Sequence, residues 1–173
     1  MDSIEAIASR RSIRRYRGQP VPEHDLLAVL EAGRLAPSAR NRQPWHFVAV
    51  TDKVTITKLA GACMGQVWFA AAPAMIVALG FPSVDRGWYV VDVSIALQNM
   101  VLAATALGYG TCWIGAFHQG LVRQIVGAPD EARVIALTPI GVAAEHPGPR
   151  SRKHLSEICS LNRYGEAYCG PSR

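Results

Sequence analysis

Residues 10–17 read RRSIRRYR and hold five arginines and one serine in eight positions. The planar guanidinium fork suits a bidentate grip on a defined phosphate better than a point charge does. A terminal phosphate offers three acceptor oxygens and nearly two negative charges, which two or three guanidinium groups and one hydroxyl can satisfy. The stretch is therefore a candidate phosphate site, and a solvated, charged loop is the alternative.

A second basic group, PRSRKHL, lies at residues 149–155. Alternate side chains of an extended segment point the same way, so Arg150 and Arg152 can reach the same phosphate as the first group. Eight of the 18 Lys and Arg residues fall in the first fifty positions, and all eight are arginine. The net charge of +5 is moderate and gathers near both ends of the chain, which favours a small anion over a long polyanion as the ligand.

Two further stretches carry groups that can bind a small molecule. LAPSARNRQPWHFVAV, residues 35–50, places Asn41 and Gln43 in a loop, where amides can hydrogen-bond a planar heterocycle or a row of hydroxyls. An ordinary helix-to-strand turn is the alternative. In GYGTCWIGAF, residues 108–117, the glycines allow backbone N–H groups to approach a ligand closely.

Motifs of side-chain catalysis are absent from the sequence. It has no G-x-G-x-x-G after a strand, no Walker loop, no H-E-x-x-H and no G-x-S-x-G. The five histidines show no metal-ligand spacing, and the four cysteines form no C-x-x-C pair, so we expect no metal site. We expect the cysteines to be free thiols, as in a reducing compartment. If the chain is an enzyme, we expect a cofactor to carry the chemistry.

The elements that must position these groups form one α+β domain over residues 1–173. The hydrophobic patterns predict helices at 3–11, 21–38, 88–107 and 119–127, and one or two short helices over 54–71. They predict strands at 45–52, 72–80 and 132–143, and a strand or strand-to-loop segment at 111–117. The continuous apolar run at 72–80 indicates a strand covered on both faces.

The helix at 88–107 is apolar nearly all round, and its apolar surface is larger than a single small sheet can cover. We therefore predict that its second face packs against another copy of the chain in a homodimer. The tail from residue 146 has too few large apolar residues for a core of its own and is expected to dock elsewhere. No signal peptide is visible and Asp92, Gln98 and Asn99 interrupt the most apolar stretch, so a cytoplasmic protein without a membrane span is expected.

Four segments, RRSIRRY, APSARNRQPWHF, ALGYGTCWIGAF and PRSRKHLSEI…NRYGE, occur in this order. Together they resemble the nitroreductase family of FMN-dependent flavoproteins, from about residue 4 to residue 168. The resemblance implies a mixed β-sheet flanked by helices in an intertwined homodimer, with two FMN sites at the interface. It also implies that the C-terminal segment, about 147–173, reaches across to the other subunit. The chain is shorter than many members, which implies a more open pocket.

The resemblance also implies roles for residues. The FMN phosphate and ribityl chain would be held by one N-terminal set, namely Arg10, Arg11, Ser12 and Arg14. The basic cluster that completes the phosphate site would be Arg150, Arg152 and Lys153. The loop against the ribityl chain and flavin edge, across the dimer interface, would be Pro37, Ser38, Ala39, Asn41 and Gln43. The pyrimidine end would meet Gln66, and the backbone near the reactive N5 would be Ile114, Gly115 and Ala116. Arg15 and Arg17 fall outside the match, and Cys112 is interpreted as a packing residue.

The function that the resemblance implies is hydride transfer from NAD(P)H through FMN N5 to a nitroaromatic, a quinone or a related small acceptor, in a ping-pong cycle. No catalytic side chain is expected, because the flavin is the redox centre. The alternatives are a specialised flavin enzyme of the same family, such as a dehydrogenase, a reductive dehalogenase or a flavin-modifying enzyme, and a basic nucleic-acid-binding module. The last lacks interleaved stacking aromatics, so neither nucleic acid nor membrane is an expected partner.

Overall fold

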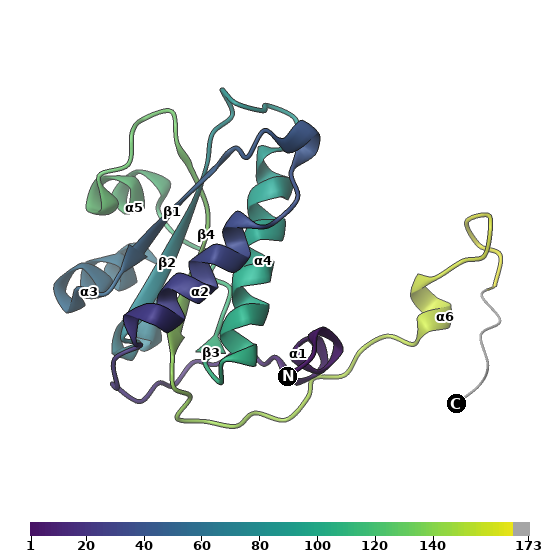
Figure 1. The fold of residues 1–173 in the computed structure, drawn as a ribbon, viewed down its shortest axis with the longest axis horizontal. Helices are drawn as coiled ribbons and strands as arrows, with labels where there is room; N and C mark the ends of the chain where they lie inside the picture. The colour runs from purple at the N-terminus through teal and green to yellow at the C-terminus, as the bar shows by residue number, and fades with distance from the viewer. Residues whose placement is uncertain (168–173) are drawn as a thin grey trace.

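A computed structural model shows a four-stranded sheet between two layers of helices (Figure 1). The structure describes residues 1–167; the predictions for Cys169 and for the end of the C-terminal segment lie outside them. The helices are α1 (Ser3–Ser9), α2 (Glu23–Arg34), α3 (Lys53–Ala62), α4 (Tyr89–Ala106), α5 (Gln119–Val126) and α6 (Leu155–Ile158), with short 3₁₀ turns η1 (Ala39–Asn41) and η2 (Val67–Ala71). The strands are β1 (Trp45–Val50), β2 (Ala74–Gly80), β3 (Gly110–Thr111) and β4 (Arg133–Gly141).

The sheet has the order β1-β2-β4-β3, and every pairing between these strands is antiparallel. Among residues 1–167, the parallel component expected of a mixed sheet is limited to an isolated bridge between Ser12 and Thr111. The expected segment at 111–117 takes the strand-to-loop form. After two residues of β3 it leaves the sheet edge and touches it once more, where Ile114 bridges Leu137.

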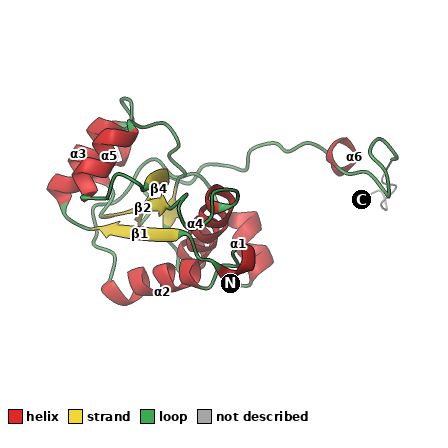
Figure 2. Cartoon of the chain, turned by 90° about the horizontal axis from the view of Figure 1, so that it is seen from above, coloured by secondary structure: helices red, strands yellow, loops and turns green. Residues whose placement is uncertain are grey.

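Strand β2 is buried along its whole length, which confirms that both of its faces are covered. Side chains alternate across a strand. Accordingly one face of β2 packs under α2 and α4 with Ala74, Ile76 and Ala78. The other face packs under α3 and α5 with Met75, Val77 and Leu79. Figure 2 shows these two helical layers on opposite sides of the sheet. The α+β fold predicted from the sequence is thereby confirmed.

Helix α4 crosses one face of the sheet and is the longest element of the chain that the structure describes. The helix is long and apolar enough to cross a membrane, and buried core helices meet the same criterion of length and composition. One side of α4 packs on α2 and on strands β2 and β4. The other side leaves Val90, Val91 and Ile95 exposed. The cytoplasmic location stays a prediction.

Candidate functional site

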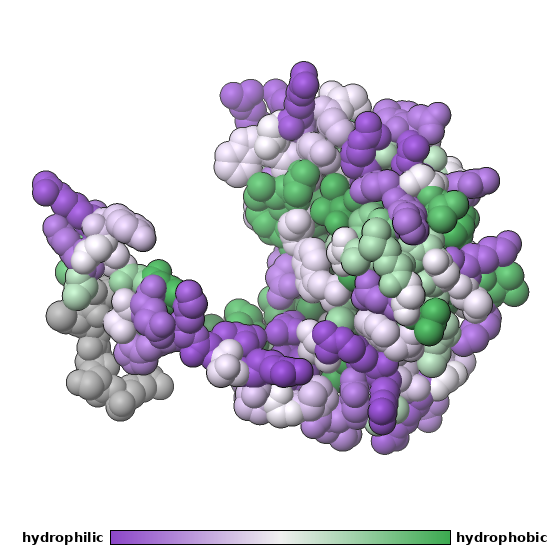
Figure 3. All heavy atoms as spheres, turned by 180° about the vertical axis from the view of Figure 1, so that it is seen from behind, coloured by the Kyte–Doolittle hydropathy of each residue, from purple (hydrophilic) through white to green (hydrophobic). Residues whose placement is uncertain are grey.

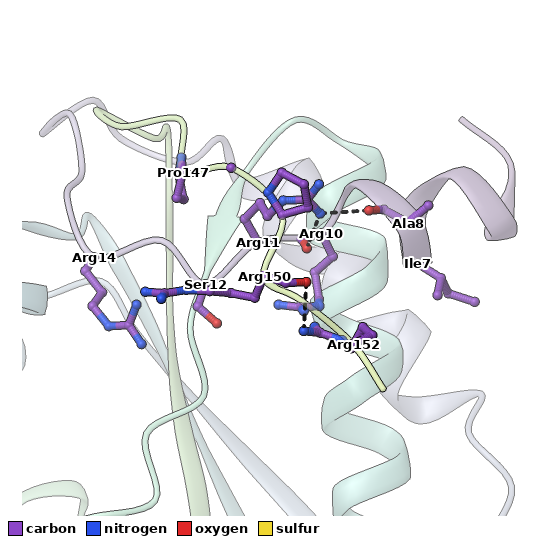
Figure 4. Close-up of a pocket in the computed structure, with 11 residues that line it drawn as sticks. Ile7, Ala8, Arg10, Arg11, Ser12, Arg14, Pro147, Arg150 and Arg152 are labelled. Atoms are coloured by element: carbon purple, nitrogen blue, oxygen red, sulfur yellow. Dashed lines mark hydrogen bonds between the residues drawn. The ribbon is translucent and has the colours of Figure 1, made fainter. Parts of the chain in front are cut away.

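Five arginines from both ends of the chain line one pocket of about 550 Å³ (Figure 4). They are Arg10, Arg11, Arg14, Arg150 and Arg152. The rest of the wall is formed by Ile7, Ala8, Ser12 and residues 147–149, whereas Lys153 is not part of the lining. Within residues 1–167, no carboxylate lies within ion-pair distance of these guanidinium groups. The pocket thus has a high density of uncompensated positive charge, as a site for a phosphate requires.

Residues 10–17, the first arginine segment, are held in place by two buried side chains. Ile13 and Tyr16 turn inward, and the Tyr16 hydroxyl donates to the Ile13 carbonyl oxygen at 2.6 Å. Burial raises the pKa of Tyr16 far above its ordinary value, so it remains a neutral donor. The Ile13 N–H donates to Thr111 O at 2.8 Å, and Gly110 lies so close under Ile13 that a Cβ would collide with it. Because these residues anchor the segment, Ser12 and Arg14 stay on the surface side.

The base of the tail pairs with the same segment. Arg17 N donates to Val142 O at 2.8 Å, Ala144 N donates to Arg15 O at 2.9 Å, and the Arg14 N–H donates to the Glu145 carboxylate. This short antiparallel ladder brings residues 147–152 beside residues 8–14. Arg14 and Glu145 are 131 positions apart in sequence, and their pairing explains how basic groups from both ends of the chain meet in one pocket.

A series of contacts leads from Arg14 of the pocket toward Gln66 and Ala116. Burial raises the pKa of the Cys112 thiol, and the nearby guanidinium of Arg14 opposes that shift. The Arg14 guanidinium also lies over the Trp68 ring, 5.9 Å from its centroid. Farther on, the Gln66 amide donates to Ala116 O at 3.2 Å. These contacts link Arg14 to Trp68, two residues after Gln66, and link Gln66 to the backbone of Ala116.

Within residues 114–116, the backbone groups are not equivalent. Ile114 is fully buried, and its N–H and C=O both bond to Leu137, at 2.9 and 3.0 Å. Its N–H is therefore used inside the sheet. Gly115 and Ala116 are exposed, and the space above the Gly115 Cα is open. If a backbone donor meets a ligand here, Gly115 or Ala116 provides it.

The loop before β1 has an unusual backbone. Arg40, Asn41 and Gln43 have φ values of 52°, 55° and 51°, in the left-handed region that few non-glycine residues adopt. Such residues concentrate at ligand clamps and cost about 1–3 kcal/mol each. Ser38 Oγ accepts a hydrogen bond from Gln43 N at 3.0 Å, and the Gln43 amide donates to Asn41 O at 3.2 Å. A strained, internally bonded loop favours a binding role over an ordinary turn.

This loop and the arginine pocket lie near opposite ends of α4. The loop contacts the first turns of the helix, where Asp92 accepts the Ala39 N–H with both carboxylate oxygens at 3.2 Å. The pocket lies beside Thr111, shortly after the helix ends at Ala106. From Asp92 to Ala106 the helix rises about 21 Å at 1.5 Å per residue. Within one chain, the structure does not bring residues 37–43 to the arginines, as Figure 1 also shows.

Sequence reasoning missed Asp92 as a residue that positions the loop. It is 2% exposed and is the one acidic residue in the long apolar helix, a signal that could have identified it. Trp68 and Glu145 were also missed. Their pairing with the first arginine segment is long-range, so no local pattern in the sequence indicates it.

Replacing Asp92 by Ala is expected to lower the free energy of unfolding by about 1–3 kcal/mol, because the Ala39 N–H loses its acceptor. Asp92→Asn keeps one oxygen and should lose less. Urea unfolding and amide exchange across residues 38–43 measure both effects. Equal stability of wild type and the alanine variant would show that Asp92 does not hold the loop.

Burial also raises the pKa of Cys63, to about 11. Thiolates are the reactive form of cysteine, so Cys63 and Cys112 should resist iodoacetamide in the folded protein at pH 7.5 and react faster as the pH rises toward 11. Peptide mapping by mass spectrometry reads the result, with urea-unfolded protein as the control. Rapid modification of Cys112 in the folded protein at pH 7.5 would contradict its interpretation as a packing residue.

The sheet between two helical layers defines an α+β protein, and the arginine pocket at the sheet edge has the chemistry that suits a phosphorylated small molecule. Comparison with known proteins makes the class specific. The nitroreductase family model matches residues 7–80 and 65–142, so the chain belongs to the nitroreductase family. The matched segments end before Arg150, Arg152 and Lys153.

Individual relatives agree with this membership. A protein of Methanothermobacter thermautotrophicus with the provisional name NADH dehydrogenase/NAD(P)H nitroreductase is 35% identical over 87% of this chain and 82% of its own length. An FMN reductase [NAD(P)H] of Bacillus subtilis is 31% identical over 87% of this chain and 68% of its own. The structure of an FMN-dependent nitroreductase from Clostridium difficile has a TM-score of 0.86 and 26% identity, covering 93% of this chain and 99% of the other.

Proposed function

We propose that this chain transfers hydride from NAD(P)H through N5 of bound FMN to a nitroaromatic, a quinone or a related small acceptor, with the reductant leaving before the acceptor binds. The class is that of the NAD(P)H-dependent flavin oxidoreductases, with FMN as cofactor, as family membership and the relatives' names support. The observation that carries the proposal is the arginine pocket formed by both ends of the chain. The contact of Arg14 with Trp68 and the hydrogen bond from Gln66 to Ala116 O support it.

The residues present fit an FMN molecule on chemical grounds. Guanidinium groups without carboxylate partners among residues 1–167 suit the phosphate, and the Ser12 hydroxyl can donate to it. The Gln66 side chain has donors and an acceptor for a pyrimidine ring. Gly115 leaves room for a flat ring to approach its backbone. The nearby positive charge would stabilise an anionic reduced cofactor electrostatically.

A homodimer is the second part of the proposal. An apolar groove of about 470 Å³ runs along the outer side of α4, lined by Val90, Val91, Ile95 and Trp113 among others. Figure 3 shows apolar surface on the side of the body that faces the projecting tail. Exposed apolar surface of this kind marks an interaction site. We infer that two α4 helices pack together there and that each loop 37–43 reaches the flavin site of the other subunit.

The C-terminal segment is the third part. Every residue from 146 to 167 is exposed, including Leu155, Ile158 and Tyr164, and the tail extends away from the body (Figures 1 and 2). Short helices with apolar side chains and no surface of their own chain to cover need a partner for stability. We infer that the segment of about 147–173 begins at its own arginine pocket and continues across the other subunit, so that residues 1–173 form one domain of an intertwined pair.

The proposal is tested by a visible spectrum and an anaerobic titration. Purified protein is expected to be yellow, to release FMN on denaturation, and to lose its flavin absorbance when NADH or NADPH is added. A panel of nitroaromatic and quinone acceptors should restore the absorbance. Colourless protein that takes up no FMN would contradict the proposal, and reduction without reoxidation by any of these acceptors would favour a specialised flavin enzyme.

A further inference from the structure

Arg40 has a backbone conformation that its residue type does not favour. Its φ and ψ are 52° and 24°, in the left-handed region, inside the short turn η1. Glycine adopts this region freely and asparagine, as at Asn41, tolerates it, whereas other side chains are disfavoured there. A glycine at position 40 would therefore remove the strain. An arginine kept at a strained position indicates that the side chain has a use.

Two acidic residues at the start of α4 hold the loop on either side of Arg40 (Figure 1). On one side, Asp92 accepts the Ala39 N–H. On the other, Arg42 Nη1 lies 3.3 Å from a carboxylate oxygen of Asp85, which is 8% exposed. Asp85 is itself fixed, because it accepts two backbone N–H groups just before α4, at 3.0 and 3.1 Å. The loop is thus held at residues 39 and 42, which lets the strained residue between them persist.

The side chain of Arg40 takes no part in holding the loop. It is exposed, and among residues 1–167 it neither donates a hydrogen bond nor lies within ion-pair distance of a carboxylate. The two arginines of the loop therefore differ in role. Arg42 pairs with Asp85 and is structural, whereas the charge and the five N–H donors of Arg40 are available to a ligand.

We propose that Arg40 selects aromatic acceptors that carry a carboxylate. This inference rests on the proposed function, which puts the loop 37–43 against the flavin of the other subunit. Arg40 stands between Ala39 and Asn41, two residues of that contact, and its free guanidinium faces the acceptor at the edge of the flavin site. A guanidinium forms a bidentate pair with a carboxylate and also stacks on aromatic rings. Hydride transfer itself needs no charge on the acceptor, so Arg40 is a specificity-determining residue.

The test compares two acceptors of nearly the same shape, 4-nitrobenzoate and 4-nitrobenzamide, on the full-length FMN-loaded protein. The flavin is reduced anaerobically with one equivalent of dithionite, and its reoxidation by each acceptor is followed by stopped-flow absorbance. Arg40→Gln should lower the ratio of the two rate constants, carboxylate over amide, by about tenfold. Arg40→Lys, which keeps the charge without the fork, should give an intermediate ratio. Arg15→Gln, with the same change in charge, should leave the ratio unchanged.

Binding and stability are measured without turnover. Benzoate titrated into the oxidised protein, followed by the flavin absorbance, should have a dissociation constant about tenfold higher in Arg40→Gln than in wild type. Arg40→Gly should lose the preference for the carboxylate and yet unfold at a urea concentration no lower than that of wild type, because glycine is unstrained at this φ.

Two outcomes would overturn the inference and leave the proposed function standing. One is an Arg40→Gln variant with the wild-type ratio of rate constants and the wild-type affinity for benzoate. The other is an Arg40→Gly variant that unfolds at a lower urea concentration, which would show that Arg40 serves stability. A protein that binds no FMN would instead refute the proposed function itself.

Discussion

Replacing Arg10 and Arg14 together by alanine is expected to yield folded protein that has lost its FMN. Both guanidinium groups line the pocket and neither donates a hydrogen bond to another residue of the described chain. Each lost charge-assisted contact should cost about 1.5–3 kcal/mol. Two such losses raise the dissociation constant of FMN by roughly 10²- to 10⁴-fold. Flavin content after gel filtration and a fluorescence titration with FMN measure the change, and circular dichroism checks the fold.

Arg15 and Arg17 provide a matched control from the same stretch. Both are exposed, neither lines the pocket, and their backbone groups pair with Ala144 and Val142. The Arg15→Ala/Arg17→Ala variant has the same change in net charge and should keep its FMN. If both double variants lost FMN equally, general positive charge and not the pocket would account for flavin binding.

Introducing a charge into the outer side of α4 is expected to separate the subunits. Ile95 is 37% exposed and lines the apolar groove. In the proposed dimer, Ile95→Asp would bury an unpaired carboxylate, which costs several kcal/mol, about 3–5. The variant should run as a monomer in light scattering after gel filtration. It should also lose most of its FMN, because the loop around Asn41 would no longer reach the arginine pocket of another chain.

Val54 on α3 offers the control for this substitution. It is 60% exposed and lies on the opposite helical layer. Val54→Asp should leave both the mass and the flavin content unchanged. A dimeric Ile95→Asp variant with full flavin content would show that the groove on α4 is not the subunit interface.

Local sequence patterns predicted most of the fold. The run Ala74–Gly80 has no polar residue, so a strand buried on both faces was the natural expectation, and it is confirmed. Asp2 precedes the predicted helix at 3–11, is a residue type that favours the N-cap, and forms a capping box with Glu5. These features depend on neighbours within a few residues, which is the range that periodicity and capping preferences describe.

Features that depend on distant partners could not be predicted in this way. The ladder between residues 14–17 and 142–145 pairs an arginine-rich segment that has no recognisable strand pattern with residues just after β4, and only the folded chain brings them together. The left-handed backbone at Arg40 and Gln43 has no signal in residue type, because neither favours that conformation. The site residues were predicted from the resemblance to the nitroreductase family and not from local patterns. The structure brings the pocket arginines together and leaves residues 37–43 at the far end of α4, and their joint role in binding FMN stays a prediction.

The central claim is that each flavin site combines arginines of one chain with the 37–43 loop of another. A heterodimer purified with two different tags tests it most directly, one chain carrying Arg10→Ala/Arg14→Ala and the other Asn41→Ala/Gln43→Ala. Each variant alone should retain little FMN. In a two-fold symmetric pair with shared sites, one site of the heterodimer is intact and the other carries both defects, so about one FMN per heterodimer is expected. A heterodimer as free of FMN as its parents would show that each chain builds its site alone and would contradict the claim.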